Sequence, residues 1–241
     1  MEDEKVMLIR PIKTRIFKAN KSLDKFILRY LPKVPDRSII VITSKIVALS
    51  QGRVLHLADK IKVIKQESDQ YIKTKWCYLT LKDGHWCANA GIDESNVESG
   101  GIILWPKDLF KTAEKLRARL LKKYKIKNLG ILITDSRIFP LRAGVTGVAL
   151  AYAGFSGLRD YIGTNDLFGR KLKMTKTNVA DSLASAAVLA MGEGAESLPL
   201  ALITDTVVKF RVKVDPRELA IDPKIDLYRP LFARLDSRRK R

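Results

Sequence analysis

Three short acidic segments carry the side chains best suited to metal and phosphate chemistry. They are residues 89–96, 133–136 and 191–194. Each closes an apolar stretch and places a carboxylate (Asp93, Asp135 or Glu193) where we expect the backbone to turn. Carboxylate, hydroxyl and amide oxygens are what hard divalent cations and their phosphate partners require. If the segments meet in space, the sequence predicts metal-dependent phosphoryl transfer. If they do not, it predicts only a basic α/β protein.

Each acidic segment also has a purely structural interpretation. An Asp after a strand commonly forms an Asx turn or caps a helix, and for Asp93 taken alone that interpretation is favoured. The alternative places Asp93 on a metal and Asn96 on a phosphate or base of a nucleotide. Asp135 and Ser136 present the same choice, since two adjacent oxygens can bind Mg²⁺ or Mn²⁺ or cap a turn. Glu193 favours a metal more strongly, because a carboxylate at a helix C-terminus opposes the macrodipole unless positive charge is near.

Cationic side chains near these segments suit an anionic ligand. Ser44 is expected to cap a helix directly after an apolar strand, with Lys45 beside it, and the free N–H groups of such a helix start attract anions. This signal is weak, because the sequence lacks a Gly-rich Walker loop. Four arginines within or after the second acidic segment could clamp a carboxylate or phosphate, or could simply carry surface charge: Arg137, Arg142, Arg159 and Arg170.

The cysteines and histidines argue against a disulfide, a zinc site and a nucleophilic triad. Asp83-Gly84 between two β-rich runs predicts a two-residue hairpin turn. Its register places Cys77 opposite Ala90 and Cys87 opposite Thr80, so the cysteines are not cross-strand partners. The two histidines lack ligand spacing, and neither cysteine lies in a nucleophile elbow. Hydrolase chemistry by Ser or Cys is therefore disfavoured.

The length and composition favour one globular domain with two lobes. The chain has 241 residues, 46% of them apolar, and its apolar runs fall well short of the ~20 residues that span a bilayer. The acidic N-terminus at residues 1–5 lacks the apolar core of a secretory signal. We therefore expect a cytoplasmic protein with no membrane partner.

The formal net charge of +19 has two interpretations. Lys-rich solvent faces are common, so ordinary surface charge is favoured. The alternative is attraction of polyanions, either nucleic acid or phosphorylated small molecules. The basic end, Arg238–Arg241, is expected to be a solvated terminus. Nucleic acid is therefore not expected as a partner, although the charge leaves it open.

Hydrophobic periodicity predicts the elements that must position these residues. Amphipathic or apolar helices are expected at residues 22–31, 44–50, 109–124 and 178–191, the last buried on nearly every side. Strands are expected at residues 6–10, 38–43, 129–134, 198–203 and 208–214. Asp135 would then lie at the carboxyl end of a buried strand, where open α/β sheets place their ligands.

In order along the chain, these segments resemble the coenzyme F420-0:L-glutamate ligase family, the γ-glutamyl ligases that extend a deazaflavin cofactor. The resemblance runs from about residue 38 to 204. It rests on residues 43–47, 51–53, 89–97, 133–136, 160–163, 166–170, 180–181 and 191–194. An ordered series of this length is far more specific than any single motif.

The resemblance implies a role for each matching residue. Asp93 and Asp135 look like ligands of a first divalent cation, and Ser136 and Glu193 like ligands of a second. Contacts to a guanine nucleotide are implied for Ser44, Lys45, Asn96, Gly192 and Gly194. The implied reaction uses GTP (or ATP) and two Mg²⁺ or Mn²⁺ ions to phosphorylate a substrate carboxylate. The amine of L-glutamate then displaces phosphate to form an amide.

The resemblance also implies an α+β fold, with mixed sheets and packed helices in two lobes, and a homodimer. Residues 1–205 would form the ligase-like domain, with no internal boundary evident between its lobes. Residues 206–241 would form a basic C-terminal strand and extension. The non-catalytic alternative is a nucleic-acid-binding protein on this scaffold, suggested by the charge.

Departures from the family pattern bear on the acceptor substrate. The family's Gly-Arg pair after Asp135 is replaced by Ile138-Phe139, although Arg142 is kept, and a family Lys is replaced by Leu49. The opening Pro11–Arg15 resembles a bacterial branch labelled as folate-metabolism γ-glutamate ligases. We expect an anionic, F420-0-like cofactor precursor as acceptor, with Arg142 as a substrate-binding residue. A folate-like acceptor is the alternative.

Overall fold

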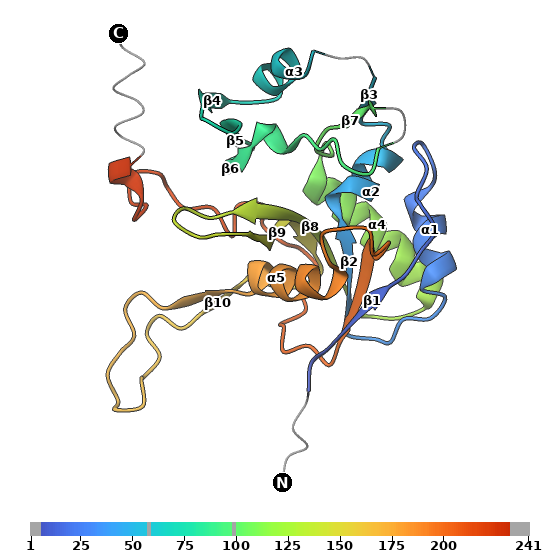
Figure 1. The fold of residues 1–241 in the computed structure, drawn as a ribbon. Helices are drawn as coiled ribbons and strands as arrows, with labels where there is room; N and C mark the ends of the chain where they lie inside the picture. The colour runs from blue at the N-terminus through green and yellow to red at the C-terminus, as the bar shows by residue number, and fades with distance from the viewer. Residues whose placement is uncertain (1–5, 57–58, 98–99, 232–241) are drawn as a thin grey trace.

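A five-stranded mixed sheet forms the centre of the computed structural model, which describes residues 6–56, 59–97 and 100–231 (Figure 1). Its strands lie in the order β1 (Leu8–Ile12), β12 (Leu200–Thr204), β2 (Ser38–Thr43), β8 (Leu129–Ile138) and β9 (Val145–Ala153). Strands β2 and β8 pair in parallel, and the other neighbours pair antiparallel. The carboxyl end of β2 therefore lies beside the middle of β8, with Thr43 opposite Thr134.

Side chains of the central strands alternate between two hydrophobic cores. Ile40 and Ile42 of β2 face one core, and Ile39 and Val41 face the other. The first core lies under three helices: α1 (Leu23–Tyr30), α2 (Ser44–Ser50) and α4 (Leu109–Tyr124). Helix α5 (Val179–Met191) covers the opposite face (Figure 1). The result is a three-layer body with helices on both sides of the sheet.

The described residues 54–56, 59–97 and 100–104 form a smaller part that lies next to α2 (Figure 1). It contains the antiparallel sheet of β4 (Gln70–Lys73), β5 (Tyr78–Lys82) and β6 (His85–Ala88) and the pair β3 (Val54–Leu55) and β7 (Ile102–Ile103). Helix α3 (Lys60–Gln66) and a 3₁₀ turn at Asn89–Gly91 complete it around a small core of its own. Mixed sheets with packed helices confirm the predicted α+β class. The predicted division at residue 205 stays a prediction.

A long arm extends from the body between β9 and α5. Strands β10 (Leu158–Asp160) and β11 (Lys176–Asn178) pair at its base, and residues 161–175 continue outward (Figure 1). The tip carries exposed apolar side chains, with Leu167 99% and Phe168 81% exposed. Among the described residues, no helix has the length and apolarity to cross a bilayer.

The strongest periodic patterns predicted their elements well. Strand β2 and helices α2 and α4 have the predicted bounds, and α4 buries its predicted stripe, including Ala113, Leu116 and Leu120. The hairpin register is also confirmed, because Thr80 pairs with Cys87. Both cysteines are free.

Three strand predictions need correction. The first strand continues through Pro11 to Ile12, which is tolerated because β1 lies at the sheet edge. Strand β8 continues to Ile138, so Asp135 lies inside a strand rather than at its end. Within the described residues, 208–214 contributes no strand, only an isolated bridge at Phe210. Its Val208 and Val214 are instead buried against the core beneath α5.

Two helix predictions and one pairing also differ. Thr43, not Ser44, is the N-cap of α2, and Ser44 is its first helical residue. Helix α5 was predicted to be buried on nearly every side, but only one of its faces is buried. Leu189 is 86% exposed, whereas Ala184 is fully buried. Cys77 lies before β5, outside the ladder in which it was expected to face Ala90.

Candidate functional site

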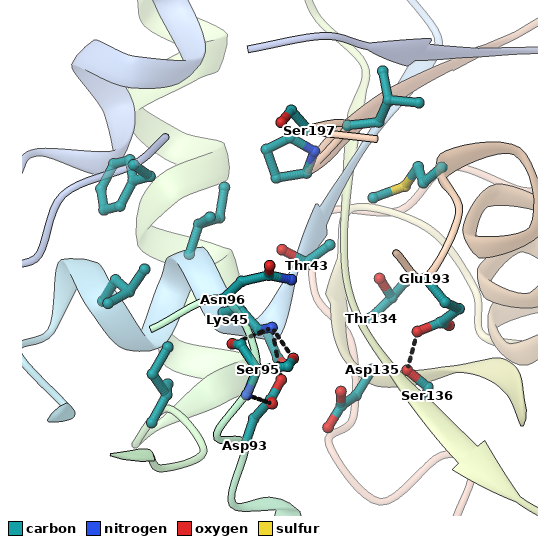
Figure 2. Close-up of a pocket in the computed structure, with 18 of the residues that line it drawn as sticks. Thr43, Lys45, Asp93, Ser95, Asn96, Thr134, Asp135, Ser136, Glu193 and Ser197 are labelled. Atoms are coloured by element: carbon teal, nitrogen blue, oxygen red, sulfur yellow. Dashed lines mark hydrogen bonds and ion pairs between the residues drawn. The ribbon is translucent and has the colours of Figure 1, made fainter. Parts of the chain in front are cut away.

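A pocket of about 570 Å³ lies where β2 and β8 approach the C-terminal end of α5. Residues from all three acidic segments line it, among them Asp93, Asp135 and Glu193 (Figure 2). The segments are far apart in the chain, but the parallel pairing of β2 with β8 brings the start of α2 next to the second one. The spatial convergence on which the metal hypothesis depends is therefore present.

One wall of the pocket carries an ion pair between Lys45 and Asp93. Lys45 Nζ lies 2.7 Å from Asp93 Oδ2 and also donates to the carbonyl and hydroxyl oxygens of Ser95, at 3.1 and 3.0 Å (Figure 2). The Ser95 backbone N–H donates to Asp93 Oδ1 at 2.7 Å, which is an Asx turn. Burial alone would raise the pKa of Asp93, but hydrogen bonds from Lys45 and Ser95 more than offset it and lower the pKa. Asp93 thus has its predicted structural role and still faces the pocket.

Asp135 is the most perturbed carboxyl group in the pocket. Burial, with a smaller contribution from the nearby negative charge of Asp93, raises its pKa to about 6. Hydrogen bonds with the Ser136 backbone and with the side chains of Trp105 and Ser44 act in the opposite direction. The indole N–H of Trp105 donates to Asp135 Oδ2. Such a carboxylate gains by pairing with a cation.

The opposite wall joins the second and third acidic segments. Ser136 Oγ donates to Glu193 Oε2 at 2.9 Å (Figure 2). Ser136 belongs to β8, whereas Glu193 lies in the turn that follows α5. This contact holds a hydroxyl and a carboxylate oxygen together at the pocket surface.

Thr134 contributes a buried hydroxyl to the pocket lining. The residue is 1% exposed, and its Oγ1 has no hydrogen-bond partner within the described part of the chain. A buried polar atom left in this state costs about 1–3 kcal/mol. A register irregularity in the pairing of β8 with β9 lies between Ile133 and Thr134. The unpaired hydroxyl is what a polar ligand in the pocket would satisfy.

The turn after α5 is tightly built around Glu196. The Gly194 N–H donates to Glu196 Oε2 at 2.8 Å. At Gly192, with φ of +79°, an added Cβ would lie 2.5 Å from the carboxyl carbon of Glu196. Both glycines line the pocket as predicted, but the Gly194 amide already has a protein acceptor.

The predicted nucleotide contacts lie in the pocket, whereas the predicted arginines do not. Ser44 and Asn96 join Lys45 in its lining. Within the described residues, none of the four arginines near the second acidic segment lines it. Arg142 is exposed in the turn between β8 and β9, and Arg137 hydrogen-bonds His85 Nδ1 at 2.8 Å. The substrate-binding role of Arg142 stays a prediction that this position does not support.

Sequence reasoning missed several pocket residues. Residues 14–17 line one end, where Ile16 and Phe17 add apolar surface, and Trp105 and Glu196 also belong to the lining. Thr134 lies within the second acidic segment, but sequence reasoning assigned it no role. Its position beside Asp135 was the available signal, whereas nothing in the local sequence distinguishes Trp105 or residues 14–17.

The oxygen donors suit a hard cation that also binds a ligand. The described residues contain no group of three or more His, Cys, Asp or Glu side chains that could hold a metal ion alone. Among the proposed donors, Ser136 and Glu193 are hydrogen-bonded to each other, and the charge of Asp93 acts on Asp135. Mg²⁺ is usually held by one or two carboxylates together with phosphate oxygens and water. The residues therefore fit a metal ion whose remaining ligands are water or phosphate oxygens.

The thiol nearest the pocket is unsuited to nucleophilic attack. Cys87 is buried, and burial raises the pKa of its thiol. Burial and the charge of Arg137 together lower the pKa of His85, which favours the neutral imidazole. These environments agree with the sequence argument against a nucleophilic triad.

Residues 11–205 match the protein family described as F420-0:Gamma-glutamyl ligase. The chain is 34% identical over 188 residues to coenzyme F420:L-glutamate ligase of Archaeoglobus fulgidus, a match covering 70% of this chain and 75% of that protein. It is 35% identical over 188 residues to the enzyme of the same name from Methanosarcina mazei, covering 70% and 74%. The Methanocaldococcus jannaschii enzyme of that name is 35% identical over 218 residues, covering 81% and 86%. All the residues that line the pocket lie within this matched range.

Proposed function

The chain belongs to the F420-0:gamma-glutamyl ligase family, and we propose that it is a nucleotide- and divalent-metal-dependent ligase that joins L-glutamate to a cofactor precursor. The observation that carries the proposal is the convergence of the three acidic segments on one pocket. The relatives' names support glutamate as one substrate and an F420-related acid as the other. A folate-like acid is the alternative acceptor.

The proposed reaction has two steps, formation of an acyl phosphate and formation of the amide. A carboxylate oxygen of the acceptor attacks the γ-phosphorus of GTP or ATP, and the bond to the nucleoside diphosphate breaks to give an acyl phosphate. The amine nitrogen of L-glutamate then attacks the acyl carbon, phosphate leaves, and the nitrogen gives up a proton to form the amide. In this proposal the pocket positions three anionic substrates and reduces the electrostatic repulsion between them.

Two divalent cations would occupy the pocket during the reaction. Asp93 and Asp135 would hold one, and Ser136 and Glu193 the other, with Mg²⁺ or Mn²⁺ as the ion. When bound, these cations offset negative charge on the transferring phosphoryl group. The chain itself supplies preorganisation, because the Ser136–Glu193 and Trp105–Asp135 hydrogen bonds already orient three of the four proposed ligands.

The nucleotide is proposed to lie along the wall formed by the start of α2 and the first acidic segment. Ser44, Lys45 and Asn96 line this wall, and Lys45 supplies the positive charge that phosphates require. Across the pocket, Gly192 and Gly194 also line the cavity, beside the carboxylate of Glu196. The hydroxyl of Thr134 is a further donor for a phosphate or carboxylate oxygen.

We propose a homodimer in the cytoplasm as the working form. The exposed apolar tip of the arm supports association, since side chains such as Phe168 and Met174 are 81% and 88% exposed. The basic surface would attract the anionic substrates by long-range steering.

The test is a reconstituted reaction with the full chain, GTP or ATP, Mn²⁺ or Mg²⁺, L-glutamate and a panel of deazaflavin and folate precursors. We expect glutamate-dependent phosphate release and, by mass spectrometry, a product heavier by one glutamyl unit. Asp135→Asn should abolish both. Asp222→Asn, an exposed carboxyl group outside the pocket, is the matched control and should keep full activity.

The same samples discriminate against a nucleic-acid-binding function. A nucleic-acid binder would associate tightly with polynucleotide in a steeply salt-dependent manner, and Asp135→Asn would leave that association intact. Such a result, together with no glutamate-dependent phosphate release from any precursor, would overturn the ligase proposal.

A further inference from the structure

Trp105 contacts the carboxyl group of Asp135 in the pocket. Its side chain is 3% exposed, and its indole N–H donates to Asp135 Oδ2. An indole is a hydrogen-bond donor with no acceptor atom, so it cannot itself become a metal ligand or compete for a cation. Its ring also keeps water away from one side of the carboxylate.

The ring of Trp105 is held in place from several sides. Gly91, with φ of +68°, leaves the space for it, because a Cβ there would lie 2.0 Å from Trp105 Nε1. The ring of His85 packs edge-on at 6.1 Å between centroids. Arg53 Nε donates to the Trp105 carbonyl oxygen at 3.1 Å, and Glu67 in turn holds Arg53. The indole donor is therefore fixed through both its ring and its backbone.

We propose that Trp105 is a positioning residue that orients Asp135 as a metal ligand. With Oδ2 engaged by the indole, the carboxylate is restricted to one orientation at the pocket, which Asp135 lines. Hydrogen bonds of this kind from neighbouring groups commonly hold metal-binding side chains in place. The inference rests on the proposed role of Asp135 as a metal ligand. Trp105 is not itself one of the four proposed metal ligands.

Two variants test the inference through the affinity for Mn²⁺ alone, measured by the electron paramagnetic resonance signal of free Mn²⁺. Trp105→Phe removes the N–H but keeps an aromatic ring, whereas Gly91→Ala keeps the N–H but displaces the ring. Both should weaken Mn²⁺ binding by about 10–100-fold. Trp76→Phe, at a tryptophan that is 87% exposed, is the matched control and should bind as the natural protein does.

A second comparison separates positioning from general damage to the fold. In an Asp135→Asn background, Trp105→Phe should cause no further loss of Mn²⁺ affinity, because the group it orients is gone. Parallel losses in both backgrounds would show a merely structural role and overturn the inference.

A spectroscopic test keeps Trp105 in place and so does not depend on the folding of a Trp105 variant. In ¹⁵N–¹H spectra, one tryptophan indole resonance should move upfield when Asp135 is changed to Asn. If all indole resonances stay in place, or if Trp105→Phe binds Mn²⁺ normally, the positioning role is overturned while the metal site stands. If the natural protein binds no Mn²⁺, both proposals are overturned.

Discussion

Lys45 and Asp93 form an ion pair at the pocket surface, with 2.7 Å between Nζ and Oδ2. Two further oxygens, both from Ser95, complete the surroundings of the ammonium group. The ammonium group of Lys45 thus contacts a carboxylate, that of Asp93, which we propose as a metal ligand. A divalent cation on Asp93 would repel the ammonium group, which could then pair with a nucleotide phosphate.

This exchange makes an unusual prediction for Lys45→Met. Nucleotide affinity should fall by about tenfold to a hundredfold, because a charge-assisted contact to phosphate is lost. Affinity for Mn²⁺ without nucleotide should be unchanged or higher, since the competing cation is gone. Calorimetric titration of each ligand measures both effects, with Lys111→Met on exposed α4 as the control. A parallel loss of both affinities would contradict the exchange.

Ser136→Ala should separate chemistry from stability. The substitution removes the hydroxyl that donates to Glu193 and that we propose as a metal ligand. Since Ser136 is exposed to the pocket, the free energy of unfolding should change by only about 0.5 kcal/mol. The rate of glutamate-dependent phosphate release should fall at least about tenfold. Ser136→Thr keeps the hydroxyl and should retain most activity, and Ser182→Ala, exposed on α5, should be neutral.

The parts of the fold that sequence reasoning predicted are those with strong hydrophobic periodicity. The apolar side chains of residues 38–43 and 109–124 follow one clear pattern in each segment, and the bounds of both elements were predicted without error. Residues 208–214 also alternate between apolar and basic side chains. Such alternation indicates which side chains are buried, but not whether the backbone hydrogen-bonds to a neighbouring strand. Val208 and Val214 reach the core from an irregular segment, so the strand prediction failed.

The site was predictable where its residues lie in short, distinctive segments. Asp93, Asp135 and Glu193 each mark such a segment, and the family resemblance assigns all three to one site. Trp105 and the apolar residues Ile16 and Phe17 reach the pocket only through tertiary packing. No local pattern predicts contacts of that kind, because they depend on how the two parts of the molecule meet.

Glu67 predicts an acid-sensitive contribution to stability. Burial raises its pKa, but hydrogen bonds from Lys82 and Arg53 outweigh burial and hold the pKa below its ordinary value. A lowered folded-state pKa means that the stabilisation is fully present above the unfolded pKa of about 4.3 and is lost as the pH falls through the folded value. Urea unfolding from pH 7 to 3 should show this loss.

The Glu67→Gln variant isolates that contribution. At pH 7 it should lower the free energy of unfolding by about 2–3 kcal/mol, somewhat less than for a fully buried broken pair, because Lys82 loses its partner in a buried position. Below pH 5 its stability should fall less steeply than that of the natural protein. Glu114→Gln, exposed on α4, should keep the natural pH profile. If the stability of the natural protein and of Glu67→Gln changed with pH in the same way, Glu67 would not be the source of the acid sensitivity.

The arm predicts the oligomeric state. Replacing Leu167 and Phe168 by Ser should convert the proposed dimer to a monomer in sedimentation velocity, since these apolar side chains are almost wholly exposed. The melting temperature of the monomer body should change little, because the arm tip contributes no residue to the hydrophobic cores of the described chain. Trp76→Ser, another exposed apolar position, is the control. A natural protein that sediments as a monomer would refute the dimer directly.

Gly147 links the packing of α5 to the position of Glu193. A Cβ at residue 147 would lie 2.4 Å from the Ala184 carbonyl oxygen and 2.6 Å from Val188 Cγ2, so β9 and α5 approach too closely for any side chain. Gly147→Ala should therefore lower the free energy of unfolding by about 1–3 kcal/mol, as measured by urea denaturation. Gly194→Ala, whose Cβ would make only an ordinary contact at 3.4 Å, is the stability control.

The same substitution should also affect the pocket at a distance. Helix α5 ends at Met191, two residues before Glu193, so a displaced helix would carry Glu193 away from Ser136. Mn²⁺ affinity of folded Gly147→Ala should fall, and in a Glu193→Gln background the substitution should cause little further loss. If Gly147→Ala destabilises the protein but leaves Mn²⁺ affinity unchanged, the turn after α5 holds Glu193 independently of the helix, through contacts such as that between Gly194 and Glu196.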